Sequence, residues 1–156
     1  MATPKQGPFS VIMNNVAVTG AITLVQIRSG STSSCEVLKA WATQGSSTVS
    51  AQQRIQINRK TAAGTVTSAT PAALTGGSPA DAVGGTAATG TLATAEGTDS
   101  TVLISDVFNV LNGWLYVPIP EERIVVPPAG FIALKFPAAS SSSITYTAGI
   151  IFQELG

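Results

Sequence analysis

The sequence predicts an all-β protein, an antiparallel β-sandwich of jelly-roll-like form with an extended N-terminal arm. Three observations lead to this fold class. Short segments alternate apolar and polar residues with a period of two, which is the side-chain period of a β-strand. Turn-forming clusters separate these segments about every ten residues, as in sandwiches, jelly rolls and related barrels. No long helical pattern alternates with the strands, so a parallel α/β fold is not expected.

Length and composition predict one domain that is partly covered by other subunits. The chain has 156 residues, of which 44% are hydrophobic and only 10% charged. A usual charged fraction is about a quarter, and disordered chains deviate towards more charge. We expect an N-terminal arm over residues 1–15 and a single β-sandwich domain over residues 16–156. The low charge indicates assembly, and the alternative is a small Thr-rich extracellular domain.

The first half of the chain predicts an arm followed by four β segments. Residues 1–8 (MATPKQGP) are polar and contain two prolines, so we expect them to extend away from the body. Residues 21–28 (AITLVQIR) are partly apolar on both faces, which is typical of a strand with neither face fully in water. Residues 53–60 (QRIQINRK) alternate cleanly. The β-prone segments 35–44 (CEVLKAWATQ) and 65–74 (TVTSATPAAL) complete this half.

The stretch from residue 72 to residue 98 consists almost entirely of small side chains. A featureless loop of this length is unusual inside a compact domain. One interpretation makes part of it short edge strands, with residues 85–97 (GTAATGTLATAEG) forming one of them. We prefer a long excursion that neighbouring chains order, because Gly, Ala and Thr let two backbones approach closely. A mobile surface loop is the remaining alternative.

The second half predicts a hairpin around Asn112–Gly113. These two residues tolerate positive φ and stand between the apolar runs 100–111 (STVLISDVFNVL) and 114–120 (WLYVPIP). A rival interpretation is a helix that is capped by Asp99 and ends at Gly113. Its apolar stripe would be Leu103, Val107 and Leu111.

The C-terminal segments predict three more strands. Residues 122–138 (ERIVVPPAGFIALKFPA) contain two apolar runs, and the Pro-Pro-Ala-Gly turn between them ends one strand and begins another. Residues 144–155 (ITYTAGIIFQEL) form the last strand, in which Gly149 indicates a bulge or a bend.

Most residues that enzymes and metal sites require are missing. The chain has no His, which removes Ser-His-Asp and Cys-His nucleophile systems and imidazole metal ligands. The single Cys35 cannot form an intrachain disulfide, and its apolar surroundings indicate a buried structural thiol rather than a nucleophile. Glu121, Glu122 and Arg123 predict a solvated turn with a surface ion pair rather than a glycosidase pair. We therefore expect no enzymatic activity, no cofactor and no metal.

Two classes of partner do not fit the sequence. The net charge is zero and the eight basic residues are scattered, so the basic footprint of a nucleic-acid-binding protein is absent. No apolar run approaches the ~18 residues that a membrane span needs. We expect neither nucleic acid nor a membrane as partner.

The aromatic residues offer one candidate for ligand binding. Trp114 and Tyr116 are two residues apart, so they share a face if they lie in a strand. Together with Trp41 they could line a sugar-binding platform. We favour the alternative, in which these rings belong to the hydrophobic core.

Three segments carry a resemblance to a known class of proteins. They are residues 39–44 (KAWATQ), 50–74 (SAQQRIQINRKTAAGTVTSATPAAL) and 108–138 (FNVLNGWLYVPIPEERIVVPPAGFIALKFPA). The chain from about Cys35 onward resembles the capsid decoration proteins, also called cement or auxiliary head proteins, of tailed bacteriophages. These are β-sandwich proteins that sit as trimers on an icosahedral head. The resemblance implies a structural virion protein on the capsid outer surface, without enzymatic site or cofactor.

The resemblance also implies two partners: the major capsid protein and further copies of the chain, as a homo-oligomer for which we expect a trimer. The family uses an N-terminal arm or the base of the sandwich to contact the capsid. We expect the apolar residues of the arm, Phe9, Val11 and Ile12, to lie at the capsid or subunit interface. The alternative is a carbohydrate- or receptor-binding β-sandwich of a phage tail fibre or another virion appendage.

Overall fold

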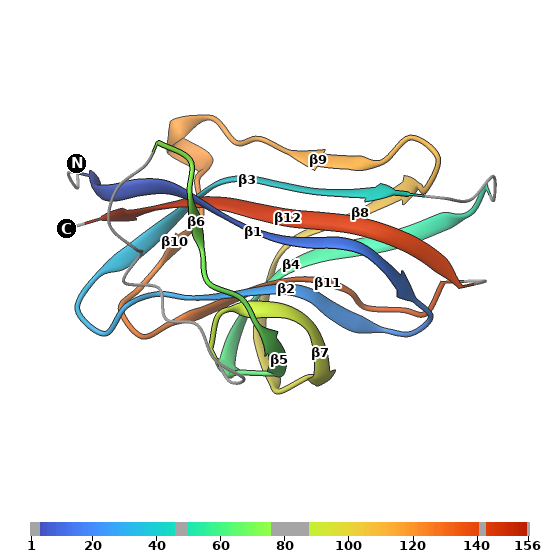
Figure 1. The fold of residues 1–156 in the computed structure, drawn as a ribbon, viewed down its shortest axis with the longest axis horizontal. Coiled ribbons are helices and arrows are strands. Elements are labelled where there is room, and N and C mark those ends of the chain that lie inside the picture. The colour runs from blue at the N-terminus through green and yellow to red at the C-terminus, as the bar shows by residue number, and fades with distance from the viewer. Residues whose placement is uncertain (1–3, 46–49, 76–87, 141–142, 156) are drawn as a thin grey trace.

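The chain folds into two antiparallel β-sheets that pack face to face (Figure 1). The computed structural model describes residues 4–45, 50–75, 88–140 and 143–155. Sheet A contains β1 (Pro4–Val18), β3 (Ser34–Gln44), β6 (Ala72–Ala73), β9 (Trp114–Tyr116), β10 (Val125–Val126) and β12 (Ile144–Leu155). Sheet B contains β2 (Ile22–Arg28), β4 (Gln52–Ala62), β5 (Thr65–Ser68), β7 (Gly90–Ala95), β8 (Thr98–Asn109) and β11 (Phe131–Phe136). This arrangement confirms the antiparallel β-sandwich.

The strand order places the two ends of the chain together. Sheet A has the order β10–β3–β12–β1–β6, and β9 pairs with the same strand, β3, as β10 does. Sheet B has the order β5–β7–β2–β11–β4–β8. The first and last strands, β1 and β12, pair from Pro4–Leu155 to Val18–Ile144 and form the centre of sheet A. Strand β8, at one edge of sheet B, is joined by residues 110–113 to β9, at one edge of sheet A.

The core lies between the sheets and follows the alternation of the sequence. Along β4, Gln53, Ile55 and Ile57 are buried, while Arg54 is exposed. The ring of Phe136 on β11 meets the ring of Tyr146 on β12 edge to face, with centroids 4.8 Å apart, and so links sheet B to sheet A. In β2 every residue from Thr23 to Ile27 is buried, which confirms that neither face of this strand lies in water.

The extended N-terminal arm is corrected by the structure. Residues from Pro4 onward belong to β1, which pairs with β12 on one side and with β6 on the other. Phe9, Val11 and Met13 alternate along β1 and are all buried. Burying a large apolar side chain is worth ~1.5–3 kcal/mol, so this alternation outweighs the prolines that indicated an arm. The described part of segment 1–15 is thus continuous with the sandwich, and residues 1–3 lie outside the described residues.

The segment around Asn112–Gly113 forms strands, and the helical alternative is wrong. The turn is tight, with Gly113 at a φ of +72°. However, β8 pairs with β4 in sheet B whereas β9 pairs with β3 in sheet A, so the two strands do not form the expected hairpin. The turn instead carries the chain from one sheet to the other at the edge of the sandwich.

Two other expectations concern the small-residue stretch and Gly149. Within residues 85–97, the stretch Gly90–Ala95 forms the short strand β7, which lies between β5 and β2 and not at the edge of sheet B. Residues 76–87 lie outside the described residues, so the ordering of this excursion by neighbouring chains stays a prediction. Gly149 has no bulge in the register of β12. A Cβ atom there would lie 2.4 Å from the Trp41 ring, so the glycine is explained by the close approach of the indole.

Candidate interaction surface

The structure divides the predicted interface residues of β1 between core and surface. Phe9 and Val11 are only 1% and 2% exposed, and the Phe9 ring packs against Phe152 with centroids 5.9 Å apart. Their side chains cannot reach a capsid or another subunit, so this part of the prediction is corrected. Ile12 has the opposite parity in the strand and is 48% exposed. Of the three residues, only Ile12 has a side chain available for contact.

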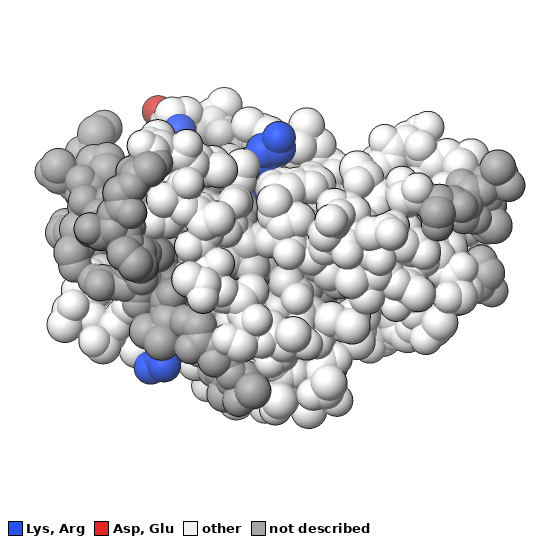
Figure 2. Space-filling view, in the orientation of Figure 1, with Lys and Arg blue, Asp and Glu red and all other residues white. Residues whose placement is uncertain are grey.

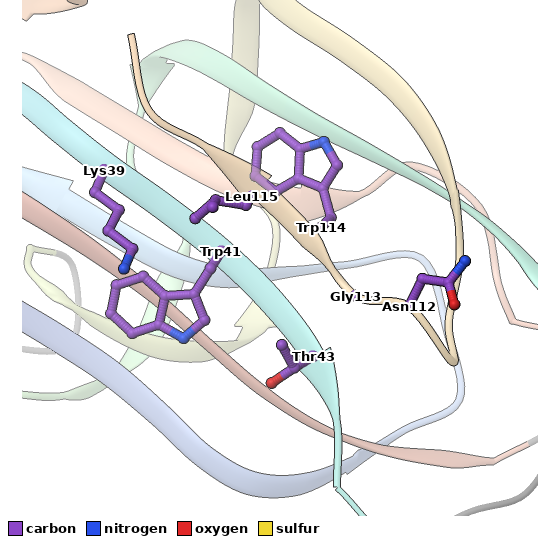
Figure 3. A pocket seen from close by; sticks show the side chains of 7 residues that line it. All are labelled: Lys39, Trp41, Thr43, Asn112, Gly113, Trp114 and Leu115. Atoms are coloured by element: carbon purple, nitrogen blue, oxygen red, sulfur yellow. The ribbon is translucent and has the colours of Figure 1, made fainter.

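The aromatic residues do not form one platform. Trp114 and Tyr116 share a face of β9, as predicted, and their rings stack with centroids 6.3 Å apart and an interplanar angle of 6°. Trp114 is buried among the core residues. Trp41 lies on the opposite face of sheet A and points away from the Trp114 indole (Figure 3). The three-ring sugar platform is therefore not formed.

A shallow pocket adjoins Trp41 on the outer side of sheet A (Figure 3). Its volume is about 290 Å³. The Lys39 ammonium lies 5.4 Å from the centroid of the Trp41 ring, which is half-buried. The pocket is lined by Lys39, Trp41 and Thr43 of β3, by Asn112 and Gly113 of the turn, and by Trp114 and Leu115 of β9. One aromatic ring surrounded by an ammonium, a hydroxyl and an amide can hold a small polar ligand.

The largest concentration of exposed apolar side chains lies along the open edge formed by β8, β9 and β10. Leu115 and Val117 are each 62% exposed, and Ile119 follows at the same spacing of two. We call this surface the apolar edge, and its residues are Val102, Val107, Leu111, Leu115, Val117, Ile119 and Val125. Singly exposed apolar residues are ordinary, but several along neighbouring segments are typical of an interaction surface. Within the apolar edge, Leu115 faces outward from sheet A beside Trp41, and Val107 faces outward from sheet B beside Arg54.

Asp106 ties the two halves of the apolar edge together. Its Oδ2 atom accepts a hydrogen bond from the Trp114 indole Nε1–H at 3.0 Å, which joins β8 of sheet B to β9 of sheet A. Its Oδ1 atom accepts a hydrogen bond from the backbone N–H of Val107 at 2.7 Å. Both carboxylate oxygens therefore have partners within the edge. The sequence signal for this surface is the alternation of Leu115, Val117 and Ile119, which the hairpin prediction did not use.

A network of four charged side chains connects β4, β11, the start of β8 and the turn that precedes it. The Lys60 ammonium, which is fully buried, lies 3.2 Å from Asp99 Oδ1 and 3.6 Å from Glu96 Oε2. The Lys135 ammonium lies 2.8 Å from Asp99 Oδ2 and 3.0 Å from Glu96 Oε2. Thr23 donates to Glu96 from both its backbone N–H and its hydroxyl. We call these four residues the ionic network, and their charges sum to zero.

The hydrogen bonds of the ionic network determine its pKa values. Burial alone would raise the pKa of Glu96, but hydrogen bonds from Thr23 and the nearby Lys135 outweigh burial and lower it. Burial also opposes ionisation of Asp99, yet its bonds from Lys135, Asn58 and Lys60 lower its pKa. Burial would lower the pKa of Lys135, and its two carboxylate partners instead raise it. All three groups are thus held in their charged forms.

The ionic network predicts an acid-sensitive fold. Because the pKa values of Glu96 and Asp99 are lowered in the fold, the two carboxylates contribute to folding stability. This contribution is complete above pH 4.5, the ordinary pKa of a Glu side chain, and is lost as the pH falls through the lowered pKa values. The contribution of Lys135 to folding stability is fully present below pH 10.5, the ordinary pKa of a Lys side chain, and is lost as the pH rises through its raised pKa. We expect the midpoint of urea unfolding to fall steeply in acid. A double variant, Glu96→Gln with Asp99→Asn, should lose most of this dependence, and an equal slope in both proteins would contradict the assignment.

The remaining candidates for chemistry behave as structural groups. Cys35 is buried, and burial together with the nearby Glu154 raises the pKa of its thiol to about 12, so it is held as a neutral thiol. Glu121 and Glu122 form an exposed 3-10 turn, as expected, but Arg123 pairs with Glu36 at 3.5 Å. Among the described residues, no group of three or more acidic, Cys or His side chains could hold a metal ion. Within the described residues, no helix is long and apolar enough to cross a membrane.

Comparisons with protein-family models, with curated proteins and with solved structures found no match to this chain.

Proposed function

We propose that the chain is a structural virion protein that binds the outside of an icosahedral phage head as an oligomer, with a trimer expected, and stabilises the capsid. The observation that carries the proposal is the apolar edge on a body with very few charges. A monomer that exposed this edge permanently would tend to aggregate, whereas a subunit of an assembly covers it. Charged side chains are sparse on the face of the molecule seen in Figure 2, which suits contact with a neutral lattice.

The strand order supports the same proposal through the fold. Strands β1, β12, β3 and β9 lie side by side in sheet A, and β2, β11, β4 and β8 lie side by side in sheet B. We infer from this order a jelly roll of eight strands, with β5, β6 and β7 inserted between its fourth and fifth strands. Jelly rolls recur in viral capsid proteins and in lectins. The fold alone does not decide between these roles, so the proposal depends on the surface.

Binding to heads tests the proposal directly. The purified chain is mixed with empty heads of tailed phages, and the heads are sedimented. We expect saturable binding at a fixed number of chains per head, together with greater resistance of the heads to heating, because a ligand that prefers the assembled shell stabilises it. Recovery of the chain in the supernatant at every concentration would reject the proposal.

The pocket beside Trp41 favours a second candidate, a carbohydrate- or receptor-binding sandwich of a tail fibre or another virion appendage. Trp41 and Trp114 are the only tryptophans, so a Trp114→Phe variant leaves Trp41 as the single reporter. A saturable change of its fluorescence with soluble bacterial surface oligosaccharides, combined with no binding to heads, would establish this candidate. An unchanged signal would exclude binding of those sugars at the pocket.

A further inference from the structure

We propose that the pocket beside Trp41 binds an acidic oligosaccharide, with one sugar ring stacked on the indole and the carboxylate of that sugar paired with the Lys39 ammonium. The inference rests on the second candidate of the proposed function, because it names the class of ligand for the same pocket. It does not depend on binding to phage heads.

The Trp41 indole lies flat on the outer face of sheet A. Gly149 of β12 is directly opposite Trp41 in the register of β3 and β12. A Cβ atom on Gly149 would lie 2.4 Å from Cζ2 and from Cη2 of the indole, and 3.0 Å from Cε2. These similar distances place the glycine under the face of the six-membered ring and not at its edge. One face of the indole thus rests on the Gly149 backbone, and the other face points away from the sheet.

A fixed aromatic face of this kind suits a sugar ring. Trp41 is half-buried and lines the pocket, so its outer face is accessible to a ligand. The face of an aromatic ring is electronegative, and the C–H groups on one side of a sugar ring pack well against it. Because the glycine backbone already supports the indole, binding requires little ordering of this side chain, which preserves affinity.

Lys39 gives the pocket its charge. It precedes Trp41 by two residues in β3, so both side chains leave the same face of the strand. Its ammonium lies 5.4 Å from the centroid of the indole, beside the ring in Figure 3. The other residues that line the pocket carry no charge, and none of the ion pairs between described residues includes Lys39. An ammonium without an anionic partner beside a stacking surface favours a carboxylate on the ligand.

The opposite end of the pocket carries uncharged polar groups. Thr43 follows Trp41 by two residues in β3, and Asn112 of the turn lines the same end. Both side chains are exposed. The Thr43 hydroxyl donates to the carbonyl oxygen of Thr147 at 3.4 Å and can still accept a hydrogen bond. The Asn112 amide can both donate and accept, as sugar hydroxyls require of their partners.

The length and the depth of the pocket indicate a short sugar chain. Lys39 and Thr43 are four residues apart in a strand, which separates their Cα atoms by roughly 13 Å. This distance exceeds the length of one sugar ring, so a neighbouring sugar reaches the end with Thr43 and Asn112. The pocket is shallow, whereas an apolar small molecule needs a cavity that encloses most of its surface.

Calorimetric titration of the full chain tests the inference. The probes are a galacturonic acid trisaccharide and a sialic acid trisaccharide, each compared with its own methyl ester, which keeps every ring and lacks the charge. We expect binding of an acid at millimolar concentrations and binding of its ester at least about fivefold more weakly, the effect of one exposed ion pair. The difference should shrink as the salt concentration rises, because an exposed ion pair is screened.

Matched variants assign the preference to single side chains. Lys39→Gln should bind acid and ester equally, and Lys39→Arg should restore the preference for the acid. Trp41→Leu should weaken the binding of acid and ester alike. The control is Arg54→Gln, which removes the same charge from an exposed position on sheet B and should bind like the wild type. Thermal unfolding checks that each variant is folded.

Three results would overturn the inference: no binding of either acid at millimolar concentrations, equal binding of acid and ester by the wild type, or a preference for the acid that survives in Lys39→Gln. Equal binding of acid and ester would still keep the second candidate as a binder of neutral sugars. Sedimentation with empty heads is measured on the same proteins. Acid binding by a chain that stays in the supernatant would reject the head-binding proposal and keep this inference, and sedimentation with heads without acid binding would do the reverse.

Discussion

Phe9→Ala is expected to lower the free energy of unfolding by about 3–5 kcal/mol, the usual loss for truncating a buried phenylalanine. Phe9 is 1% exposed, and its ring packs against Phe152 across the β1–β12 pair at the centre of sheet A. The truncation would leave a cavity that neighbouring strands cannot close without breaking their register. Urea unfolding followed by tryptophan fluorescence measures the change.

Ile12→Ala is the matched control, because Ile12 is on the same strand and faces solvent. Its substitution should change the free energy of unfolding by less than about 1 kcal/mol. If Phe9→Ala were as mild as Ile12→Ala, β1 would not be an integral strand of the core. The same placement predicts that deletion of residues 1–15 prevents folding, so a truncation cannot separate capsid binding from stability.

The second large effect is expected from removal of both acids of the ionic network. Glu96→Gln combined with Asp99→Asn should lower the free energy of unfolding by about 3 kcal/mol, because the Lys60 ammonium would stay buried without a charged partner. The two carboxylates are about one-third exposed, which places the effect at the low end of the range for buried ion pairs. Urea unfolding at neutral pH gives the measurement.

Replacement of Lys60 separates this cause from a general loss of packing. Adding Lys60→Met to the double variant removes the unpaired charge and should recover at least about 1 kcal/mol, since an apolar side chain of similar length fills the site. A triple variant less stable than the double variant would show that the methylene packing of Lys60, and not its charge, is the dominant contribution.

Local alternation was sufficient to predict most strands but not their partners. Ile55 and Ile57 of β4, and the doubly buried run of β2, carry the signal within a few neighbouring residues. The pairing of β8 with β4 and of β9 with β3 depends on residues far apart in the sequence, such as Gln56 and Ser105. The Asn112–Gly113 step therefore indicated a tight turn correctly, while the hairpin that usually accompanies it was wrong.

The candidate surface was only partly accessible from the sequence for the same reason. Phe9, Val11 and Ile12 form one apolar run, and only the pairing of β1 with β12 determines which of them face the core. The ionic network joins Lys60, the neighbouring acids Glu96 and Asp99, and Lys135, which come from three separate parts of the sequence and looked like scattered charges. By contrast, the spacing of Leu115, Val117 and Ile119 beside a long stretch without basic residues was visible and indicates the edge.

The pairing of Pro4 with Leu155 has a mechanical consequence. Because the first and last strands are antiparallel neighbours whose outer ends meet at one pole, a force that pulls the chain ends apart acts on their ladder from that pole. The hydrogen bonds between β1 and β12 would break one after another, like a zip, instead of sharing the load. Tension applied through the ends would thus open the centre of sheet A first, whereas tension applied along the strands from opposite poles would have to shear the whole ladder at once.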